Sequence, residues 1–158
     1  MNKSWIANGF TAANALFGGL SIMMSISGEY HVAAICILIA MAADAFDGRV
    51  ARALGTAGPM GGELDSLSDD ISFGVAAGAL MYSYQLRELG AFGFIPCALL
   101  GAFCAFRLAR FNVKVTSVHG YFEGLPCPTV GVIIACYVLS GVKIWNWLAM
   151  VCVLALAV

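Results

Sequence analysis

The order of apolar and polar positions divides this chain into long uncharged runs separated by short clusters of charge. The uncharged runs are 4–28, 30–43, 71–86, 89–106, 124–142 and 144–158. A helix of about 20 apolar residues crosses the hydrocarbon core of a bilayer, and several of these runs approach that length. We therefore predict an all-α integral membrane bundle of six transmembrane helices, at about 8–27, 31–53, 63–86, 91–113, 125–142 and 144–158.

Two of the predicted connections are long enough to cover a site. The segment 53–62 holds four glycines and a proline, which indicates a loop between the second and third helices. The segment 114–124 follows the fourth helix on the same side of the membrane. No linker or low-complexity tract divides the chain, so we predict a single domain over 1–158.

Composition and charge support a membrane protein and suggest its orientation. The 158 residues are 61% hydrophobic and 11% charged, whereas an ordinary soluble domain is about 25% charged. In membrane proteins, basic residues concentrate on the cytoplasmic side. The N-terminus and the candidate site should therefore lie on the cytoplasmic side of the cell membrane. The predicted cytoplasmic ends carry Lys3, Arg49, Arg52, Arg107, Arg110 and Lys114, and the outer ones carry Arg87 and Lys143. Nothing in the charge pattern suggests nucleic-acid binding.

Four aspartates gather around the first long connection. Asp44 and Asp47 are three residues apart and Asp65 and Asp69 are four apart, so each pair shares one face of its helix. An antiparallel turn between the two helices would bring all four carboxylates to one depth. Their mutual repulsion in a low dielectric requires compensation, which a pair of divalent cations provides. Oxygen ligands without histidine suit Mg²⁺ or Mn²⁺.

The residues beside these aspartates suit a phosphate group. Gly48 has no side chain and allows close approach to the backbone, and Arg52 lies one turn further on, where it could pair with a phosphate. The spacing alone also allows a simpler interpretation, in which individual aspartates cap a helix or face solvent. Asp65, for example, could favour the positive end of its helix.

The stretch DAFDGRVAR, followed by eight residues and GGELDSLSD, resembles the signature of the CDP-alcohol phosphotransferases. That signature is D-x2-D-G-x2-A-R-x8-G-x3-D-x3-D, filled here by Asp44, Asp47, Gly48, Ala51, Arg52, Gly61, Asp65 and Asp69. The resemblance implies an integral membrane enzyme with six transmembrane helices, usually a homodimer. It implies transfer of a phosphatidyl-type group from a CDP-linked lipid to an alcohol, with release of CMP.

The same resemblance assigns roles within the signature. Asp44, Asp47 and Asp65 would bind two divalent cations, Mn²⁺ or Mg²⁺, and Asp69 would complete that metal site and act as the catalytic general base. The residues expected to contact the CDP group, or to make room for it, are Gly48, Ala51, Arg52 and Gly61.

Segments outside the signature resemble the phosphatidylserine synthase branch of that family. They are 8–19, 63–74, 107–113 and 121–129. This branch implies CDP-diacylglycerol as the donor and L-serine as the acceptor. Glycerol 3-phosphate or an inositol phosphate as acceptor, and a CDP-archaeol donor, stay open. A divalent-metal transporter is an alternative of another class, but acidic residues gather at one membrane edge and do not trace a path to the other.

Basic residues of the fourth helix are candidates for binding the acceptor. Arg107 and Arg110 lie three residues apart on one face, with Asn112 just beyond. They could bind the serine carboxylate or the lipid phosphate. Alternatively, the two arginines anchor the helix by reaching to lipid headgroups.

Polar residues also recur along the first helix. Asn8, Thr11 and Gly18 follow helical spacing, with Asn14 nearby. By resemblance to the family, Asn8 and Thr11 would bind the CDP group at its cytidine base. Hydrogen bonding between helices, with a close contact at the glycine, is an equal alternative.

Overall fold

Helices make up all of the regular structure in the residues that this computed structural model describes, which are 4–54, 59–114 and 126–157. The all-α class is thus confirmed over these ranges. In chain order the elements are α1 (Ser4–Ile26), α2 (Tyr30–Leu54), α3 (Pro59–Asp69), the π-helical η1 (Asp70–Val75), α4 (Ala76–Tyr84), the 3₁₀-helical η2 (Leu86–Leu89), α5 (Ala91–Lys114), α6 (Cys127–Leu139) and α7 (Asn146–Ala157).

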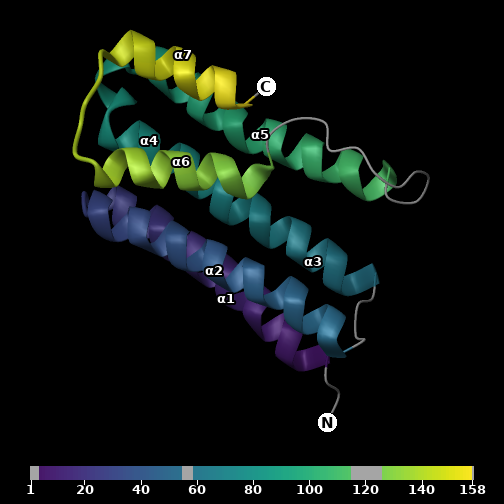
Figure 1. Cartoon of the computed structure of the whole chain (residues 1–158). Helices are drawn as coiled ribbons and strands as arrows, with labels where there is room; N and C mark the ends of the chain where they lie inside the picture. The colour runs from purple at the N-terminus through teal and green to yellow at the C-terminus, as the bar shows by residue number, and fades with distance from the viewer. Residues whose placement is uncertain (1–3, 55–58, 115–125, 158) are drawn as a thin grey trace.

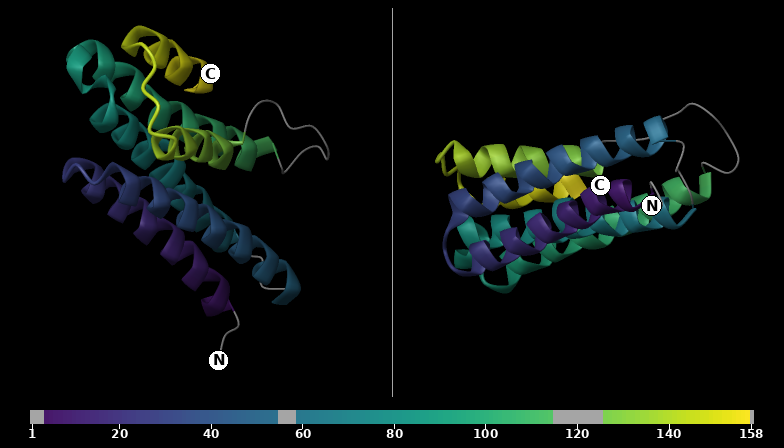
Figure 2. Two further views of the ribbon diagram at one scale, coloured as in Figure 1. Left: turned by 60° about the vertical axis from the view of Figure 1, so that its left-hand side comes forward. Right: turned by 90° about the horizontal axis from the view of Figure 1, so that it is seen from below.

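The helices run side by side in alternating directions, which gives the bundle two distinct ends (Figures 1 and 2). The end of α2, the start of α3 and the end of α5 lie together at one end, on the right in Figure 1. The turns from α1 to α2, from α4 to α5 and from α6 to α7 lie at the other. Because α2 and α3 are antiparallel, residues near the end of one helix and the start of the other meet at the same level.

The elements α3, η1 and α4 form one continuous helical rod, since right-handed helical backbone persists at both junctions. It covers most of the helix predicted at 63–86. The predicted loop 53–62 is wrong at both ends, because α2 continues to Leu54 and α3 already begins at Pro59. A proline is tolerated at the first position of a helix, where its missing N–H has no intrahelical partner to lose. Residues 55–58 lie outside the described part of the chain.

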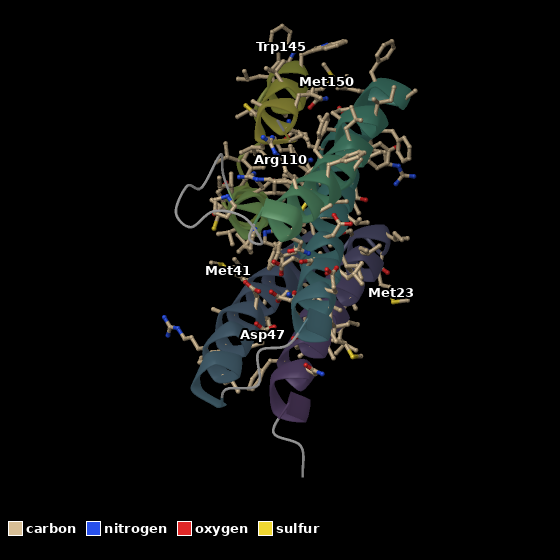
Figure 3. The ribbon with its side chains drawn as sticks, turned by 90° about the vertical axis from the view of Figure 1, so that its right-hand side faces the viewer. Met23, Met41, Asp47, Arg110, Trp145 and Met150 are labelled. Carbon is tan, nitrogen blue, oxygen red and sulfur yellow. The ribbon has the colours of Figure 1, made fainter. Side chains whose placement is uncertain are left out.

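The outer surface of the bundle is more apolar than that of a water-soluble bundle. Large apolar side chains face outward; Leu16, Met23 and Phe106 are 61%, 66% and 75% exposed. Met23 projects away from the bundle in Figure 3, whereas Asp47 lies between helices. Small and polar side chains fill much of the interior. Small residues let helices approach closely within a bilayer, and an apolar exterior suits lipid.

Three helices are long and apolar enough to cross a membrane within the described residues: Asn8–Ile26, Tyr30–Val50 and Ala91–Arg110. They favour an integral membrane protein. The apolar helices α6 and α7 have 13 and 12 residues, or about 20 Å at 1.5 Å per residue. The hydrocarbon core is about 30 Å thick. Three of the six predicted helices are thus candidate spans by length and composition, and the crossing of a membrane by six helices stays a prediction.

A buried polar network closes the end of the bundle that lies away from the aspartates. The Gln85 side chain, 4% exposed, donates to the backbone carbonyl of Ile144 and, at 3.1 Å, to Oδ1 of Asn146. The hydroxyl of Tyr137 donates to Oε1 of Gln85 and accepts from the backbone N–H of Ile144 at 3.0 Å. The network therefore joins the end of α4 to α6 and to the start of α7.

Candidate active site

The carboxylates of α2 and α3 converge between the helices, as their spacing predicts. One oxygen from each of Asp44, Asp47 and Asp65 can be chosen so that all three lie within 4.8 Å of one another. Mg²⁺ binds oxygen at about 2.0–2.1 Å, so ligands on a shared ion lie roughly 3–4 Å apart. Small side-chain rotations would bring these three oxygens to that spacing.

Burial makes a cation in this cluster physically reasonable. Asp47 is 5% exposed. Its Oδ2 and the Oδ1 of Asp65 are shielded from solvent, and neither has a hydrogen-bond partner among the described residues. Shielded carboxylate oxygens without a partner are rare and costly, and neighbouring negative charges add to the cost. A divalent cation satisfies both the unpaired oxygens and the charge, so the donor set fits a hard cation.

Asp69 stands beside this cluster and is held differently. Its carboxyl group lies within hydrogen-bonding reach of that of Asp44. Nδ2 of Asn14 donates to Oδ1 of Asp69 at 3.0 Å. Asp69 is 7% exposed and Asn14 is completely buried. The structure therefore brings the fourth aspartate of the motif to the other three, with one oxygen bound by an amide of α1.

The first helix contacts the carboxylates through its polar face. The hydroxyl of Thr11 lies in hydrogen-bonding range of Asp47. One turn later, the backbone carbonyl of Asn14 accepts a bond of 2.9 Å from the hydroxyl of Ser72 in η1. This close approach depends on Gly18, because a Cβ there would lie 2.9 Å from the Cα of Ser72. Thr11 and Asn14 therefore both make contacts between helices, and the assignment of Thr11 to the CDP group stays a prediction.

The other residues expected at the CDP group lie around the same end of the bundle. Gly48 is half-buried in α2, directly after Asp47. Gly61 lies in the first turn of α3, not in a loop, and a Cβ there would lie 3.9 Å from Oδ1 of Asn8. Ala51 and Arg52 belong to the last part of α2, but their side chains lie outside the described part of the structure.

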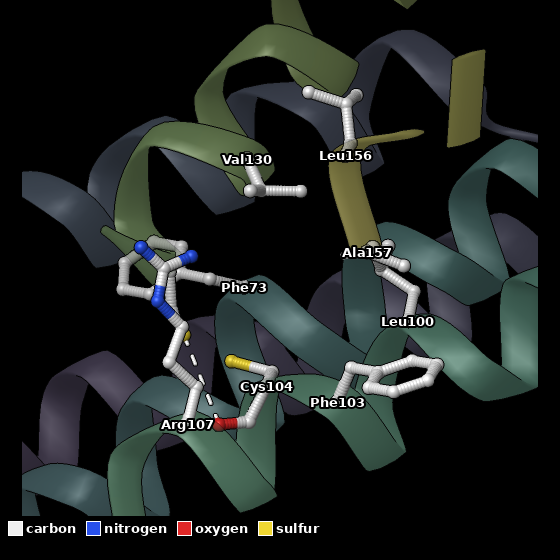
Figure 4. A pocket seen from close by; sticks show the side chains of 9 residues that line it. Phe73, Leu100, Phe103, Cys104, Arg107, Val130, Leu156 and Ala157 are labelled. Atoms are coloured by element: carbon white, nitrogen blue, oxygen red, sulfur yellow. Dashed lines mark hydrogen bonds between the residues drawn. The ribbon is translucent and has the colours of Figure 1, made fainter. Parts of the chain in front are cut away.

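The candidate acceptor residues of α5 separate into different surroundings. Nδ2 of Asn112 donates to the hydroxyl of Ser66, next to Asp65, at 3.0 Å, which brings the end of α5 to α3. Arg107 lines a small hollow, partly open to the surface, whose walls are otherwise mostly apolar. Its side chain faces Val130 and Leu156 across that hollow in Figure 4. Arg110 is exposed.

A comparison with protein families decides where this arrangement belongs. The family profile described as CDP-alcohol phosphatidyltransferase matches residues 4–158. The chain belongs to this family. The resemblance carried by the aspartate motif is therefore confirmed, and the transporter alternative loses its basis. In this CDP-alcohol phosphatidyltransferase, the clustered carboxylates are those of the aspartate motif.

Curated relatives within the family carry names that specify serine. The chain is 38% identical over 137 residues to the CDP-diacylglycerol–serine O-phosphatidyltransferase of Helicobacter pylori, an alignment that covers 86% of this chain and 58% of the relative. The enzyme of that name from Bacillus subtilis is 38% identical over 122 residues, covering 77% and 68%. An archaetidylserine synthase of Methanothermobacter thermautotrophicus is 40% identical over 130 residues, covering 81% and 55%. The chain thus spans little more than half the length of two of these three relatives.

The structure of this CDP-alcohol phosphatidyltransferase also reveals contacts that the sequence did not indicate. In the sequence, Asn14 is only a neighbour of other polar residues, yet it hydrogen-bonds the fourth aspartate. Nothing in the sequence distinguishes Ser66 and Ser72, which hydrogen-bond α5 and α1 respectively. The sequence indicates only that Asn14 lies three residues after Thr11 and therefore shares its helix face. The partner across that face follows only from packing.

Proposed function

We propose that the protein transfers the phosphatidyl group of CDP-diacylglycerol to the hydroxyl of L-serine, forming phosphatidylserine and releasing CMP. The observation that carries the proposal is the convergence of Asp44, Asp47 and Asp65, the second buried and the others half-buried, with Asp69 alongside. It occurs in a CDP-alcohol phosphatidyltransferase chain whose curated relatives have names that specify serine.

The residues divide the chemistry among them. Asp44, Asp47 and Asp65 would hold two divalent cations, Mn²⁺ or Mg²⁺, with Asp69 adjoining them; when bound, these ions neutralise the diphosphate and stabilise the departing oxygen of CMP. Asp69 accepts the proton of the serine hydroxyl as its oxygen attacks the phosphorus attached to diacylglycerol. The bond from that phosphorus to the CMP oxygen breaks, and its electron pair leaves with CMP. We favour direct attack, because no activated side-chain nucleophile is evident.

Substrate recognition would surround this centre. Asn8, Thr11, Gly48, Ala51, Arg52 and Gly61 are the residues that we assign to the CDP group. Arg107, Arg110 and Asn112 are assigned to the serine carboxylate or the lipid phosphate. Support for the second group comes from the bond between Asn112 and Ser66, which places the end of α5 next to Asp65.

The membrane arrangement is part of the proposal. We infer six crossings in a single domain, with the N-terminus and the carboxylate cluster on the cytoplasmic side of the cell membrane. The excess of Lys and Arg at that end of the bundle supports this orientation. A homodimer is expected from the resemblance to the family alone.

A second donor is favoured by one specific observation. The Methanothermobacter relative is named for archaetidylserine, an ether-linked lipid, and is as similar to this chain as the bacterial relatives are. Both donors share the CDP group and differ in their hydrocarbon chains. CDP-archaeol is therefore the alternative donor, with serine unchanged.

The test is metal-dependent release of CMP by purified protein in detergent. CDP-diacylglycerol and CDP-archaeol are each combined with Mn²⁺ or Mg²⁺ and with L-serine, glycerol 3-phosphate or an inositol phosphate. Release with serine alone supports the proposal, and release with another acceptor refutes the choice of serine. Asp69→Asn should keep Mn²⁺ and donor binding while losing turnover, and a near-normal kcat in this variant would remove Asp69 from the role of base.

A further inference from the structure

Asn14 occupies a position that the proposed chemistry leaves without a role. The residue is completely buried in the contact between α1 and the rod of α3 and η1. Its Nδ2 donates to Oδ1 of Asp69 at 3.0 Å, and its backbone carbonyl accepts from the hydroxyl of Ser72 at 2.9 Å. Both ends of the residue are therefore attached to the rod that carries Asp69.

The other half of the Asn14 amide makes this burial unfavourable for the fold alone. Its Oδ1 is shielded from solvent and has no hydrogen-bond partner among the described residues. A buried acceptor without a partner is destabilising, and an apolar side chain of the same size would avoid that penalty. The donated bond to Asp69 is the feature of Asn14 that a leucine could not reproduce.

A general base benefits from such a bond because an aspartate carboxylate rotates readily. The terminal torsion of aspartate has a broad distribution, so the side chain alone does not define which oxygen faces the substrate. A hydrogen bond to one oxygen restricts that rotation and leaves the other oxygen available. Holding a reacting group in one orientation before the substrate arrives lowers the barrier to reaction.

We propose that Asn14 is a positioning residue for Asp69: its amide holds Oδ1, so that Oδ2 is directed at the hydroxyl of the acceptor. This inference rests on the proposed function, in which Asp69 accepts the hydroxyl proton. It assigns Asn14 to the base and not to the cytidine of the donor. The contact between Thr11 and Asp47 one turn earlier supports it, because the same face of α1 meets a second carboxylate there.

The experiment compares Asn14→Leu and Asn14→Ala with the unmodified protein in the CMP-release assay. Loss of a bond that orients a reactive side chain commonly reduces activity by about 10–100-fold, and we expect that loss in kcat. KM for CDP-diacylglycerol and the Kd for Mn²⁺ should stay within about threefold, because the ground-state contacts of the donor are unchanged. Ser21→Ala is the matched control: Ser21 is also completely buried in α1 and its hydroxyl has no described partner. It should keep kcat.

A double variant separates action through Asp69 from a general effect on the bundle. If Asn14 works through Asp69, then adding Asn14→Leu should cause no further loss in the residual kcat that the Asp69→Asn protein retains. A multiplicative loss in the double variant would overturn the proposal. A raised KM for the donor with unchanged kcat would instead assign Asn14 to the nucleotide.

The remaining outcomes are equally decisive. If neither Asn14 variant folds, as judged by thermal denaturation and Mn²⁺ binding, the residue is structural and the proposal fails. An Asn14→Leu protein with the kcat of the unmodified protein would refute the positioning role and leave the proposed function intact. Absence of CMP release by the unmodified protein itself, with any donor and acceptor, would refute the proposed function instead.

Discussion

Gly18→Ala offers a direct test of the contact between α1 and the rod that carries the site. A Cβ at residue 18 would lie 2.9 Å from the Cα of Ser72 and 3.1 Å from its Cβ. Backbone cannot move aside as a flexible side chain does, so α1 must shift outward. The adjacent Gly19 supplies a matched control, because a Cβ there would have no atom within 4 Å.

The expected energies have opposite signs at the two positions. Replacing glycine by alanine within a helix stabilises it by roughly 0.5–1 kcal/mol, and Gly19→Ala should show this gain. Overpacking typically destabilises by about 1–3 kcal/mol, so Gly18→Ala should lose up to about 2 kcal/mol net. An outward shift of α1 would also lengthen the bond between Asn14 and Asp69, so kcat should fall only in the Gly18 variant.

The assay is thermal denaturation of the purified protein in detergent, together with CMP release. We expect a lower apparent Tm and a lower kcat for Gly18→Ala, and an equal or higher Tm with normal kcat for Gly19→Ala. Equal stability and equal activity of the two variants would refute the close approach of α1 to η1. A stability loss of the same size at Gly19 would show that the effect does not depend on the contact with Ser72.

Three further predictions concern other parts of the molecule. Asp65→Asn should weaken Mn²⁺ binding at least tenfold, because removing a group that merely supports a metal ligand already lowers metal affinity by about 10–100-fold. Calorimetry that finds an unchanged Kd would exclude Asp65 as a ligand. Gln85→Leu should lower the free energy of unfolding by about 1–3 kcal/mol, since Tyr137 loses a buried partner, while KM values stay constant; a Tm equal to that of the unmodified protein would contradict this. Arg107→Leu should raise KM for serine more than KM for the CDP-lipid, and steady-state kinetics showing the reverse would place Arg107 at the donor.

Local patterns were sufficient to place most of the helices and to find the aspartates. Uncharged runs predicted α1, α2 and α5 to within a few residues, because an apolar run of that length is stable as a helix with its backbone bonds satisfied internally. Spacing alone put Asp44 with Asp47, and Asp65 with Asp69, on shared faces, since that periodicity is a property of the helix itself. Boundaries were less secure: glycines and a proline suggested a loop where α3 begins at Pro59.

The partners of those residues depended on how the helices pack. Asn14 and Thr11 lie on one face of α1, but only the rotation of that helix and its approach at Gly18 bring them to Asp69 and Asp47. The position of Asn112 against Ser66 likewise requires α5 to lie beside α3. Helical periodicity determines which residues share one side of a helix. Which residues of the neighbouring helix contact them depends on how side chains pack across the whole interface. For that reason the aspartate cluster could be predicted from the sequence, and the amide that holds Asp69 could not.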